Sequence, residues 1–336
     1  MQRFNNKRPI ALLGLAVLLS LALPAVAQDD VDPLEATRVA FMGAETDEER
    51  LAIAEDFLAK YPEHDNIGDV LDAAIGVLQG MDNEAGAIKL AEEQLLRTEG
   101  ADQTRAIQTA LLDLYADPAH AGKLKGLVQD MYDPGTMTFG DHLTVLNAAT
   151  GAEAWSMVDT HAEAAKPMAT AEAFKAAYPD RDFTDKYVEE MGSNRQGLLL
   201  TFAGWSAANQ GDLKGAEKTF KQAEKLVRPN FFGLPNNELY RYWGETLVLK
   251  DDSKKGLEKL ALAGLYSNDD VAAARAEDVY ASLDRKEDYD DYLWDLRRKK
   301  APKMEDFEAV NYQDEVKSFH ELKGKKATLV SFWFPT

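Results

Sequence analysis

The sequence predicts a mainly α-helical protein of paired helices, followed by a short segment of α/β character. Three observations predict this class. Apolar residues recur with the 3.6-residue period of a helix from about Asp32 to Lys300. Small residues recur at equal offsets in two neighbouring helix pairs of that region. A nearly continuous apolar, β-rich run then occupies Ala327–Phe334, as in a strand buried on both faces.

The N-terminus has the three-part pattern of a secretory signal peptide. Met1–Pro9 is basic, Ile10–Leu23 is apolar, and the small residues Ala25 and Ala27 follow. We expect residues 1–27 to be removed and the mature protein to cross the inner membrane into the periplasm. An uncleaved anchor is the alternative, but the apolar run is shorter than the ~20 residues of a spanning helix. No stable membrane anchor is therefore expected after cleavage.

Composition restricts the possible functions. Apolar residues make up 45% of the 336 residues, enough for a globular core. The formal charge of −20 repels phosphate backbones, so nucleic acid is not expected as a partner. The absence of cysteine excludes structural disulfides, thiolate metal sites and a cysteine nucleophile within these residues.

No residue of the sequence is predicted to be catalytic, to bind a cofactor or to ligate a metal. There is no glycine-rich phosphate loop and no G-x-S-x-G pattern. Acidic pairs such as Asp29-Asp30 and Asp269-Asp270 are expected to be solvated or to cap helices. The histidines lack metal-ligand spacing and are expected to be solvated or lightly packed imidazoles: His64, His120, His142, His161 and His320.

The helical region begins with clear start and stop signals. Thr46 and Glu49 form a T-x-x-E capping box, and the proline of Tyr61-Pro62 ends the helix that follows it. Short polar or Gly/Pro links separate the six helices that follow, none of which is expected to exceed about 20 residues. These six are predicted at Ile67–Leu78, Glu84–Arg97, Ala101–Tyr115, Ala119–Met131, Phe139–Ala149 and Ala152–Ala165.

An internal repeat is clearest between residues 194 and 268. Measured from Gly204 and from Gly244, apolar residues recur at offsets of 12, 16 and 19. Small residues at these positions allow two helices to approach closely, and a bulky residue fills the groove between them. The first set is Ala216, Phe220 and Ala223, and the second is Gly256, Leu260 and Ala263.

These residues resemble tetratricopeptide repeats (TPR), which place small residues at the helix crossing and proline near the end of the repeat. The resemblance is good over Leu200–Pro229, fair over Tyr240–Ala263 and weak earlier. It implies that residues 28–300 form a TPR-like α-solenoid of helical hairpins. Such a body has a concave surface that binds client proteins or peptides, or it is a scaffold that spaces another domain.

Two groups within this region have alternative interpretations. Tyr240, Tyr242 and Trp243 are either a ligand-binding box or part of the core, and their helical spacing favours the core. The acidic run Glu287–Asp291 is expected to be a solvated helix surface or a linker.

The pattern changes after Lys300. Phe307–Val310 and Val316–Phe319 are predicted to be two short strands around a turn. Ala327–Phe334 is predicted to be a buried strand, with a buried helix as the competing interpretation. Flanking Gly324 and Pro335 favour the strand.

This last segment resembles the start of the redoxin group of thioredoxin-like proteins. The resemblance rests on Asp306-Phe307, Phe319, the turn Leu322–Lys325 and the run Leu329–Trp333. The group includes TlpA/ResA-type thiol–disulfide oxidoreductases and AhpC/TSA-related peroxiredoxins. In that family a Cys-x-x-Cys motif follows the strand, and the helix start lowers the pKa of its first thiol.

Residues 301–336 are therefore expected to be the N-terminal part of a thioredoxin-like domain, truncated before its cysteines. On this hypothesis the chain is a fragment of an exported oxidoreductase with a helical repeat arm, and it has no thiol-redox activity itself. An intact ending, in which Ala327–Phe334 pairs with another strand across a dimer, is the alternative. The second hypothesis for function is a periplasmic TPR-like adaptor that binds proteins and has no enzymatic activity.

Overall fold

The structure is a computed structural model in which the contacts divide the chain into two compact units, Met1–Asp284 and Arg285–Thr336. In the first unit the described residues are almost entirely helices and their connecting loops. The predicted mainly α-helical class is therefore confirmed. The predicted signal peptide at residues 1–27 lies outside the described residues. The structure describes residues 32–230, 233–235, 238–300, 308–310 and 316–318.

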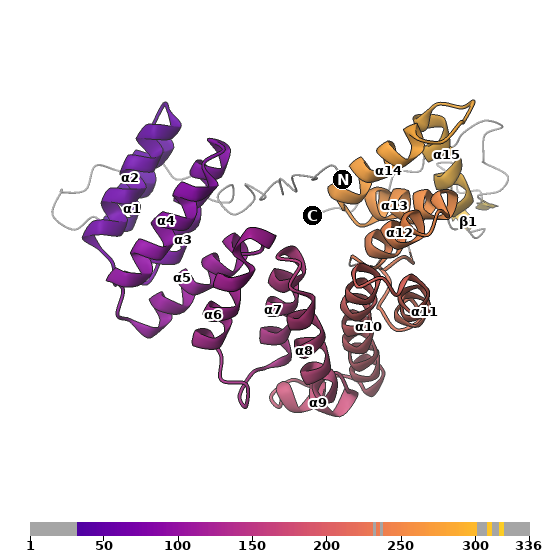
Figure 1. Cartoon of the computed structure of the whole chain (residues 1–336), viewed down its shortest axis with the longest axis horizontal. Helices are drawn as coiled ribbons and strands as arrows, with labels where there is room; N and C mark the ends of the chain where they lie inside the picture. Colours follow the sequence, from indigo (N-terminus) through magenta and orange to yellow (C-terminus); the bar gives the residue numbers. More distant parts are fainter. Residues whose placement is uncertain (1–31, 231–232, 236–237, 301–307, 311–315, 319–336) are drawn as a thin grey trace. The chain divides into compact units, whose positions relative to one another are not determined.

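The helices of the first unit follow one another in the order of the sequence (Figure 1). Those up to residue 165 are α1 (Pro33–Gly43), α2 (Asp47–Lys60), α3 (Ile67–Gly80), α4 (Glu84–Arg97), α5 (Ala101–Leu114), the 3-10 turn η1 (Pro118–His120), α6 (Ala121–Met131), α7 (Phe139–Gly151) and α8 (Trp155–Ala165). Those that follow are the 3-10 turn η2 (Lys166–Met168), α9 (Ala171–Ala177), α10 (Asp185–Asn209), α11 (Leu213–Ala223), α12 (Leu239–Leu249), α13 (Ser253–Tyr266) and α14 (Asp270–Ala281).

Local sequence signals place these helices where they were predicted. Thr46 Oγ1 accepts the backbone N–H of Glu49 at 3.2 Å, and the Glu49 carboxylate accepts that of Thr46 at 3.3 Å, so the capping box is confirmed. Helix α2 ends at Lys60, immediately before Tyr61-Pro62. The bounds of α4 coincide with the prediction, and those of the other five predicted helices agree to within a few residues.

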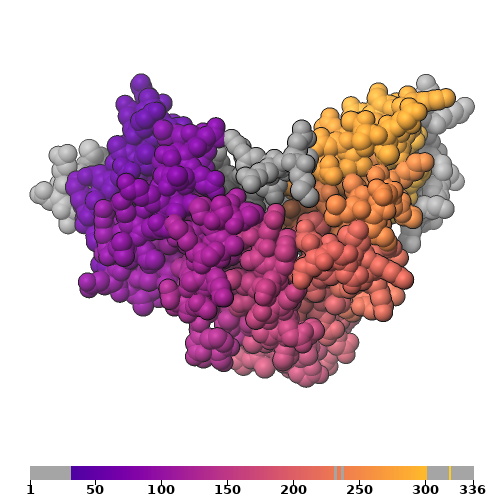
Figure 2. Space-filling model, viewed as in Figure 1, coloured from indigo at the N-terminus to yellow at the C-terminus, as the bar shows by residue number. Residues whose placement is uncertain are grey.

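Each helix packs mainly on the helices next to it in the sequence. Contacts between alternate helices also join α3 to α5, α5 to α7, α8 to α10 and α10 to α12. Figure 2 shows the same order in the first unit, where the colours follow the sequence from one helix to the next across the face in view. Contacts between neighbours are typical of proteins in which helical hairpins are added one after another.

One continuous core runs from α2 to α10. Phe57, Leu71, Leu111 and Leu146 are at most 1% exposed and come from α2, α3, α5 and α7. Burial of each such side chain contributes roughly 1.5–3 kcal/mol. The period-3.6 pattern of the sequence is thus the pattern of residues that face this core.

The predicted close crossings of helices are present in α10–α11 and α12–α13. A Cβ atom added to Gly204 would lie 2.7 Å from the Phe220 ring, and one added to Gly244 would lie 2.7 Å from Leu260. Gly256 is equally restricted, because its Cβ would lie 2.8 Å from the carbonyl oxygen of Gly244. The bulky residues at offset 16, Phe220 and Leu260, are fully buried. The small residues are therefore required by the approach of two backbones.

Helix α10 is longer than the six predicted helices, all of which stay below about 20 residues as expected. It has 25 residues and begins at Asp185, where the Thr184 side chain accepts the N–H of Tyr187. Gly192 and Gly197 lie inside it without breaking it. Each glycine faces a neighbouring backbone, since an added Cβ would lie 2.5 Å from the Ala171 nitrogen or 2.7 Å from that of Val227. These glycines are packing positions, so they do not end the helix.

The second unit contains α15 (Tyr289–Lys300) and a two-stranded antiparallel ladder. Strand β1 (Glu308–Val310) pairs with β2 (Val316–Ser318), and Ala309 lies opposite Lys317. The two predicted short strands are thus confirmed over their described residues, and the helical pattern ends at Lys300 as predicted. No thioredoxin-like α/β domain is seen among the described residues of this unit. The predicted strand 327–334 lies outside them.

Candidate binding surface

Three aromatic rings form a continuous series across α8, α10 and α12. The Trp155 and Trp205 rings meet edge to face, with centroids 6.4 Å apart and an interplanar angle of 89°. On α12, Tyr242 stacks on Trp205 at 4.8 Å and 5°. Both tryptophans are partly exposed, whereas Tyr242 is buried. We call this series, together with Asp159 of α8, the aromatic face.

Asp159 connects α8 to the end of α10. Its Oδ1 accepts the Ser206 hydroxyl at 2.7 Å, and its Oδ2 accepts the Gln210 side-chain amide at 3.0 Å. Ser206 is fully buried, whereas Asp159 is exposed. Gln210 also donates to Ser206 Oγ at 2.8 Å. The two donors fix the orientation of a carboxylate that is open to solvent.

Two ion pairs continue from α12 to α14. Arg241 lies over the Tyr242 ring, 4.9 Å from its centroid, and its Nε lies 2.8 Å from Asp269 Oδ2. Arg275 donates Nε–H to both Glu245 oxygens at 3.0 and 3.1 Å. Burial raises the pKa of the Glu245 carboxyl, and Arg275 works against that shift. These charges are matched within the fold, so their role is to hold α14 against α12.

Asp269 has the helix-start role that was expected for the pair Asp269-Asp270. It caps α14 by accepting the N–H of Ala272 at 3.0 Å. The acidic run 287–291 is mostly exposed, with Asp288 accepting the N–H of Asp291, as expected for a solvated helix start.

The core interpretation of Tyr240, Tyr242 and Trp243 is confirmed, because all three are at most 7% exposed. The Tyr240 hydroxyl donates to Glu224 at 2.6 Å. The Lys259 ammonium lies 3.7 Å from the Tyr240 ring centroid and 2.8 Å from the Glu224 carboxylate. Burial raises the pKa of Tyr240. This cluster ties α11, α12 and α13 together.

His142 and His161 are brought together, which the expectation of scattered, lightly packed imidazoles missed. Their Nδ1 atoms lie 3.0 Å apart between α7 and α8, and His142 is 3% exposed. Burial lowers the pKa of His161 to about 4, and the neighbouring His142 acts in the same direction. Burial also lowers the pKa of His142, against the effect of Asp141. At neutral pH one neutral ring donates to the other.

Neither His64 nor His120, the two other described histidines, lies against a second histidine. His64 packs edge to face on Phe57, and its Nε2 lies 3.7 Å from Asp32. His120 lies beside Tyr115. His320 is outside the described residues.

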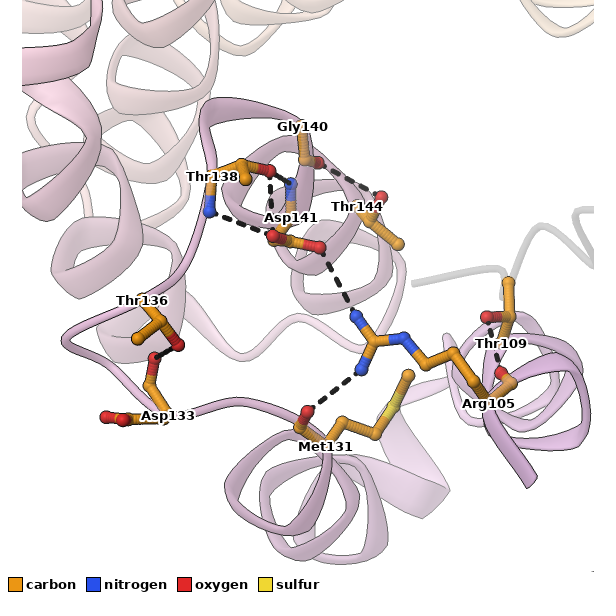
Figure 3. A network of polar contacts seen from close by, with 9 residues as sticks. All are labelled: Arg105, Thr109, Met131, Asp133, Thr136, Thr138, Gly140, Asp141 and Thr144. Atoms are coloured by element: carbon orange, nitrogen blue, oxygen red, sulfur yellow. Dashed lines mark hydrogen bonds and ion pairs between the residues drawn. The ribbon is translucent and has the colours of Figure 1, made fainter. Parts of the chain in front are cut away.

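Arg105 joins three helices (Figure 3). It donates Nη1–H to the carbonyl of Met131 at 2.9 Å, at the end of α6, and Nη2–H to Asp141 Oδ1 at 3.3 Å, in the first turn of α7. Its guanidinium also lies 4.1 Å from the Tyr132 ring centroid. The other Asp141 oxygen accepts the N–H of Thr138 in a capping box. The partners of Arg105 all belong to the fold, so this network is a structural joint.

A hollow between α4 and α6 contains a second carboxylate that is held by hydrogen bonds from two side chains. Glu92 accepts from the Tyr115 hydroxyl at 2.5 Å and from Lys123 at 2.6 Å. The hydrogen bond from Lys123, followed by that from Tyr115, lowers the pKa of Glu92. Lys89 and His120 also line this hollow. Glu92 and Lys123 pair with each other across this hollow, so this carboxylate already has a cation within the fold.

Among the described residues, no group of three or more histidine or acidic side chains is arranged to hold a metal ion. Within the same residues, no helix combines the length and the apolar character that crossing a membrane requires.

Sequence reasoning did not single out Trp155, Asp159 or Trp205. The sequence does contain two local signals by which these residues could be found. Trp155 and Asp159 are one helical turn apart, and Trp205 follows the repeat glycine Gly204. What joins them is the packing of α8 on α10.

Comparisons with protein-family models, with characterised protein sequences and with solved structures found no match. The resemblances to tetratricopeptide repeats and to redoxins therefore stay predictions from the sequence.

Proposed function

We propose that the helical unit is a protein-binding module, a TPR-like α-solenoid that binds a peptide or a partner protein along the aromatic face. The observation that carries the proposal is the ring series Trp155–Trp205–Tyr242, which crosses three helices and leaves two tryptophans partly exposed. Tryptophan, tyrosine and arginine contribute most of the binding energy in protein interfaces.

The repeated hairpins support the same proposal. The pairs Gly204–Phe220 and Gly244–Leu260 have the same spacing and the same close contact, as stacked repeats require. Stacked repeats form extended surfaces to which several helices contribute, and such surfaces typically bind extended peptides. In the aromatic face, α8 and α10 each supply one partly exposed ring, and the buried Tyr242 ring of α12 stacks on Trp205 and supports it.

The test is selection from a phage-displayed random peptide library on the whole chain, followed by affinity measurements. We expect enriched peptides to bind the chain and the variant Trp205→Ala to weaken them at least tenfold, equivalent to about 1.4 kcal/mol. Trp294→Ala is the control, because Trp294 is 59% exposed and belongs to the second unit. Circular dichroism checks that both variants are folded.

The proposal is wrong if no peptide is enriched over phage without an insert. It is also wrong if Trp205→Ala binds the peptides as well as the parent chain does.

A second candidate function is that the helical unit serves a thioredoxin-like redoxin in the same polypeptide. The sequence of residues 306–333 supports it, as does the antiparallel pairing of the two strands predicted there. The decisive observation is the nucleotide sequence of the gene after the codon for Thr336. A Cys-x-x-Cys within the next few codons, with insulin reduction by the full-length product, is expected. Absence of that motif removes this candidate.

We also propose that the protein is exported to the periplasm. The support is the sequence pattern of residues 1–27. N-terminal sequencing of the protein from a periplasmic extract should begin at Gln28, whereas an uncleaved Met1 would contradict this.

A further inference from the structure

Asp159 differs from Glu217 and Glu92, two other carboxylates of the first unit that side chains hold by hydrogen bonds. Glu217 accepts from Lys221 and Lys250, and Glu92 accepts from Lys123, so each has a cation of its own. Asp159 accepts only from the neutral groups of Ser206 and Gln210. Among the described residues no ion pair joins it to a lysine, arginine or histidine. Its negative charge is held in place and is not neutralised.

The surroundings of Asp159 favour a positive charge. Trp155 lies one turn earlier on the same helix, and Trp205 directly precedes Ser206, whose hydroxyl holds the carboxylate. Aromatic faces attract cations, and the attraction is stronger where water is excluded. Helix α10 ends at Asn209, so the negative end of its dipole lies beside the Gln210 contact. The carboxylate, the indole rings and the C-terminal end of α10 therefore all attract a positive charge.

We propose that Asp159, Trp155 and Trp205 form a surface site for the cationic side chain, arginine or lysine, of a basic segment in the partner protein. This inference rests on the proposed binding function and names the chemistry of the partner. The cation pairs with the Asp159 carboxylate and packs its flat or aliphatic part against the indole rings. The formal charge of −20 on the whole chain increases the rate at which a basic segment encounters it.

The experiment uses the whole chain labelled with 5-fluorotryptophan. Its five tryptophans give five fluorine NMR signals, each assigned by a Trp→Phe variant. The probe is an acetylated and amidated Gly-Arg-Gly-Arg-Gly peptide, and the control peptide has citrulline in place of both arginines. We expect the arginine peptide to shift the Trp155 and Trp205 signals to saturation, and the citrulline peptide to leave them unchanged.

Two variants that each remove one negative charge distinguish binding at a local site from attraction by the overall charge of the chain. Asp159→Asn should raise the dissociation constant of the arginine peptide at least fivefold. Asp130→Asn removes the same charge from an exposed position on α6 and should change that constant less than twofold. An unchanged Trp243 signal, from the core, reports that each variant keeps its fold.

Two results would overturn the inference: unshifted Trp155 and Trp205 signals, or equal losses in the two variants. If the phage selection enriches peptides that depend on Trp205 but lack arginine and lysine, the cation site is wrong and the binding module stands. If the selection enriches nothing and no signal moves, both are wrong.

Discussion

Gly204 lies against the ring of Phe220 so closely that a Cβ atom on residue 204 would be 2.7 Å from Phe220 Cε1. Gly244 has the same relationship to Leu260, at the equivalent position of the next hairpin. Real Cβ atoms essentially never approach other heavy atoms below 3.0 Å. Both hairpins therefore depend on the absence of a side chain at these two positions.

Gly204→Ala should destabilise the protein. The added methyl group forces the buried Phe220 ring or the helix to move, which typically costs about 1–3 kcal/mol. Alanine recovers up to about 1 kcal/mol of helix propensity, which is too little to offset the larger values. Urea unfolding followed by circular dichroism measures the difference, and Gly244→Ala should behave in the same way.

Gly76→Ala provides the matched control. Gly76 is also inside a helix, α3, but an added Cβ would meet no heavy atom within 4 Å. This variant should be as stable as the parent or up to about 1 kcal/mol more stable. Equal stabilisation of the Gly76 and Gly204 variants would show that the α10–α11 crossing has room for a side chain.

The His142–His161 pair should make stability depend on pH in mildly acidic solution. Burial holds the folded-state pKa of His161 near 4, below its ordinary value of 6.5, so the unfolded chain binds more protons between these values. The stabilisation is complete above about pH 6.5 and is lost as pH falls toward 4, by up to about 1.4 kcal/mol per pH unit. Asp141, which also pairs with Arg105, is the carboxylate that opposes this shift at His142.

Urea titrations at several values between pH 7 and pH 4.5 measure this dependence. Other carboxylates also titrate there, so the relevant quantity is the difference between the parent and His161→Gln. The variant should lose less stability over this interval. Parallel curves for the two proteins would mean that His161 is protonated equally in the folded and unfolded chain.

Much of this fold follows from local signals that a single sequence contains. The capping box at Thr46 and the stop at Pro62 act within one helical turn, and their effect was predicted correctly. The repeat glycines Gly204 and Gly244 were also identified, because their spacing to Phe220 and Leu260 is regular. Each of these features depends on one helix or on one hairpin.

The contacts that were missed depend on packing between elements distant in the sequence. Asp159 and Ser206 are 47 residues apart, and His142 meets His161 only because α7 packs on α8. The residue pattern of a single helix does not predict contacts between side chains of two different helices. The length of α10 was missed for a related reason, since Gly192 serves a contact with Ala171 and does not end the helix.

Arg105→Ala should loosen the joint of α5, α6 and α7. It removes the hydrogen bond to Met131, the ion pair with Asp141 and the stacking on Tyr132. We expect a loss of about 1–3 kcal/mol, since charged hydrogen bonds contribute roughly 1.5–3 kcal/mol each and this site is partly exposed. Hydrogen exchange of the loop 132–138 should also become faster.

Arg97→Ala is the control for this prediction. Arg97 lies exposed at the end of α4, where its ion pair with Glu93 spans 3.6 Å on the surface of the same helix. Its loss should cost less than about 0.5 kcal/mol. A similar effect of both variants would indicate that Arg105 contributes no more than a surface arginine does.

Two threonines in Figure 3 should respond oppositely to replacement by alanine. Thr138 is the N-cap of α7: its hydroxyl accepts the N–H of Asp141 at 3.2 Å, and its own N–H donates to the Asp141 carboxylate at 2.8 Å. Thr138→Ala leaves the Asp141 N–H without its cap and should cost about 1 kcal/mol in urea unfolding. The Asp141 carboxylate also loses its 2.7 Å bond from the Thr138 hydroxyl, which weakens its hold on Arg105.

Thr144 lies inside the same helix, where its hydroxyl donates back to the Gly140 carbonyl at 3.1 Å. This bond adds little, because that carbonyl already lies in the helical ladder, and threonine has a lower helix propensity than alanine. Thr144→Ala should therefore leave stability unchanged or raise it by up to about 0.7 kcal/mol. The two substitutions remove the same atoms within two turns of each other. A similar loss of stability in both would therefore mean that the loss comes from packing and not from the cap. A loss of stability in Thr138→Ala alone would show that the stabilisation comes from the N-cap hydrogen bonds. The same bonds orient the Asp141 carboxylate toward Arg105.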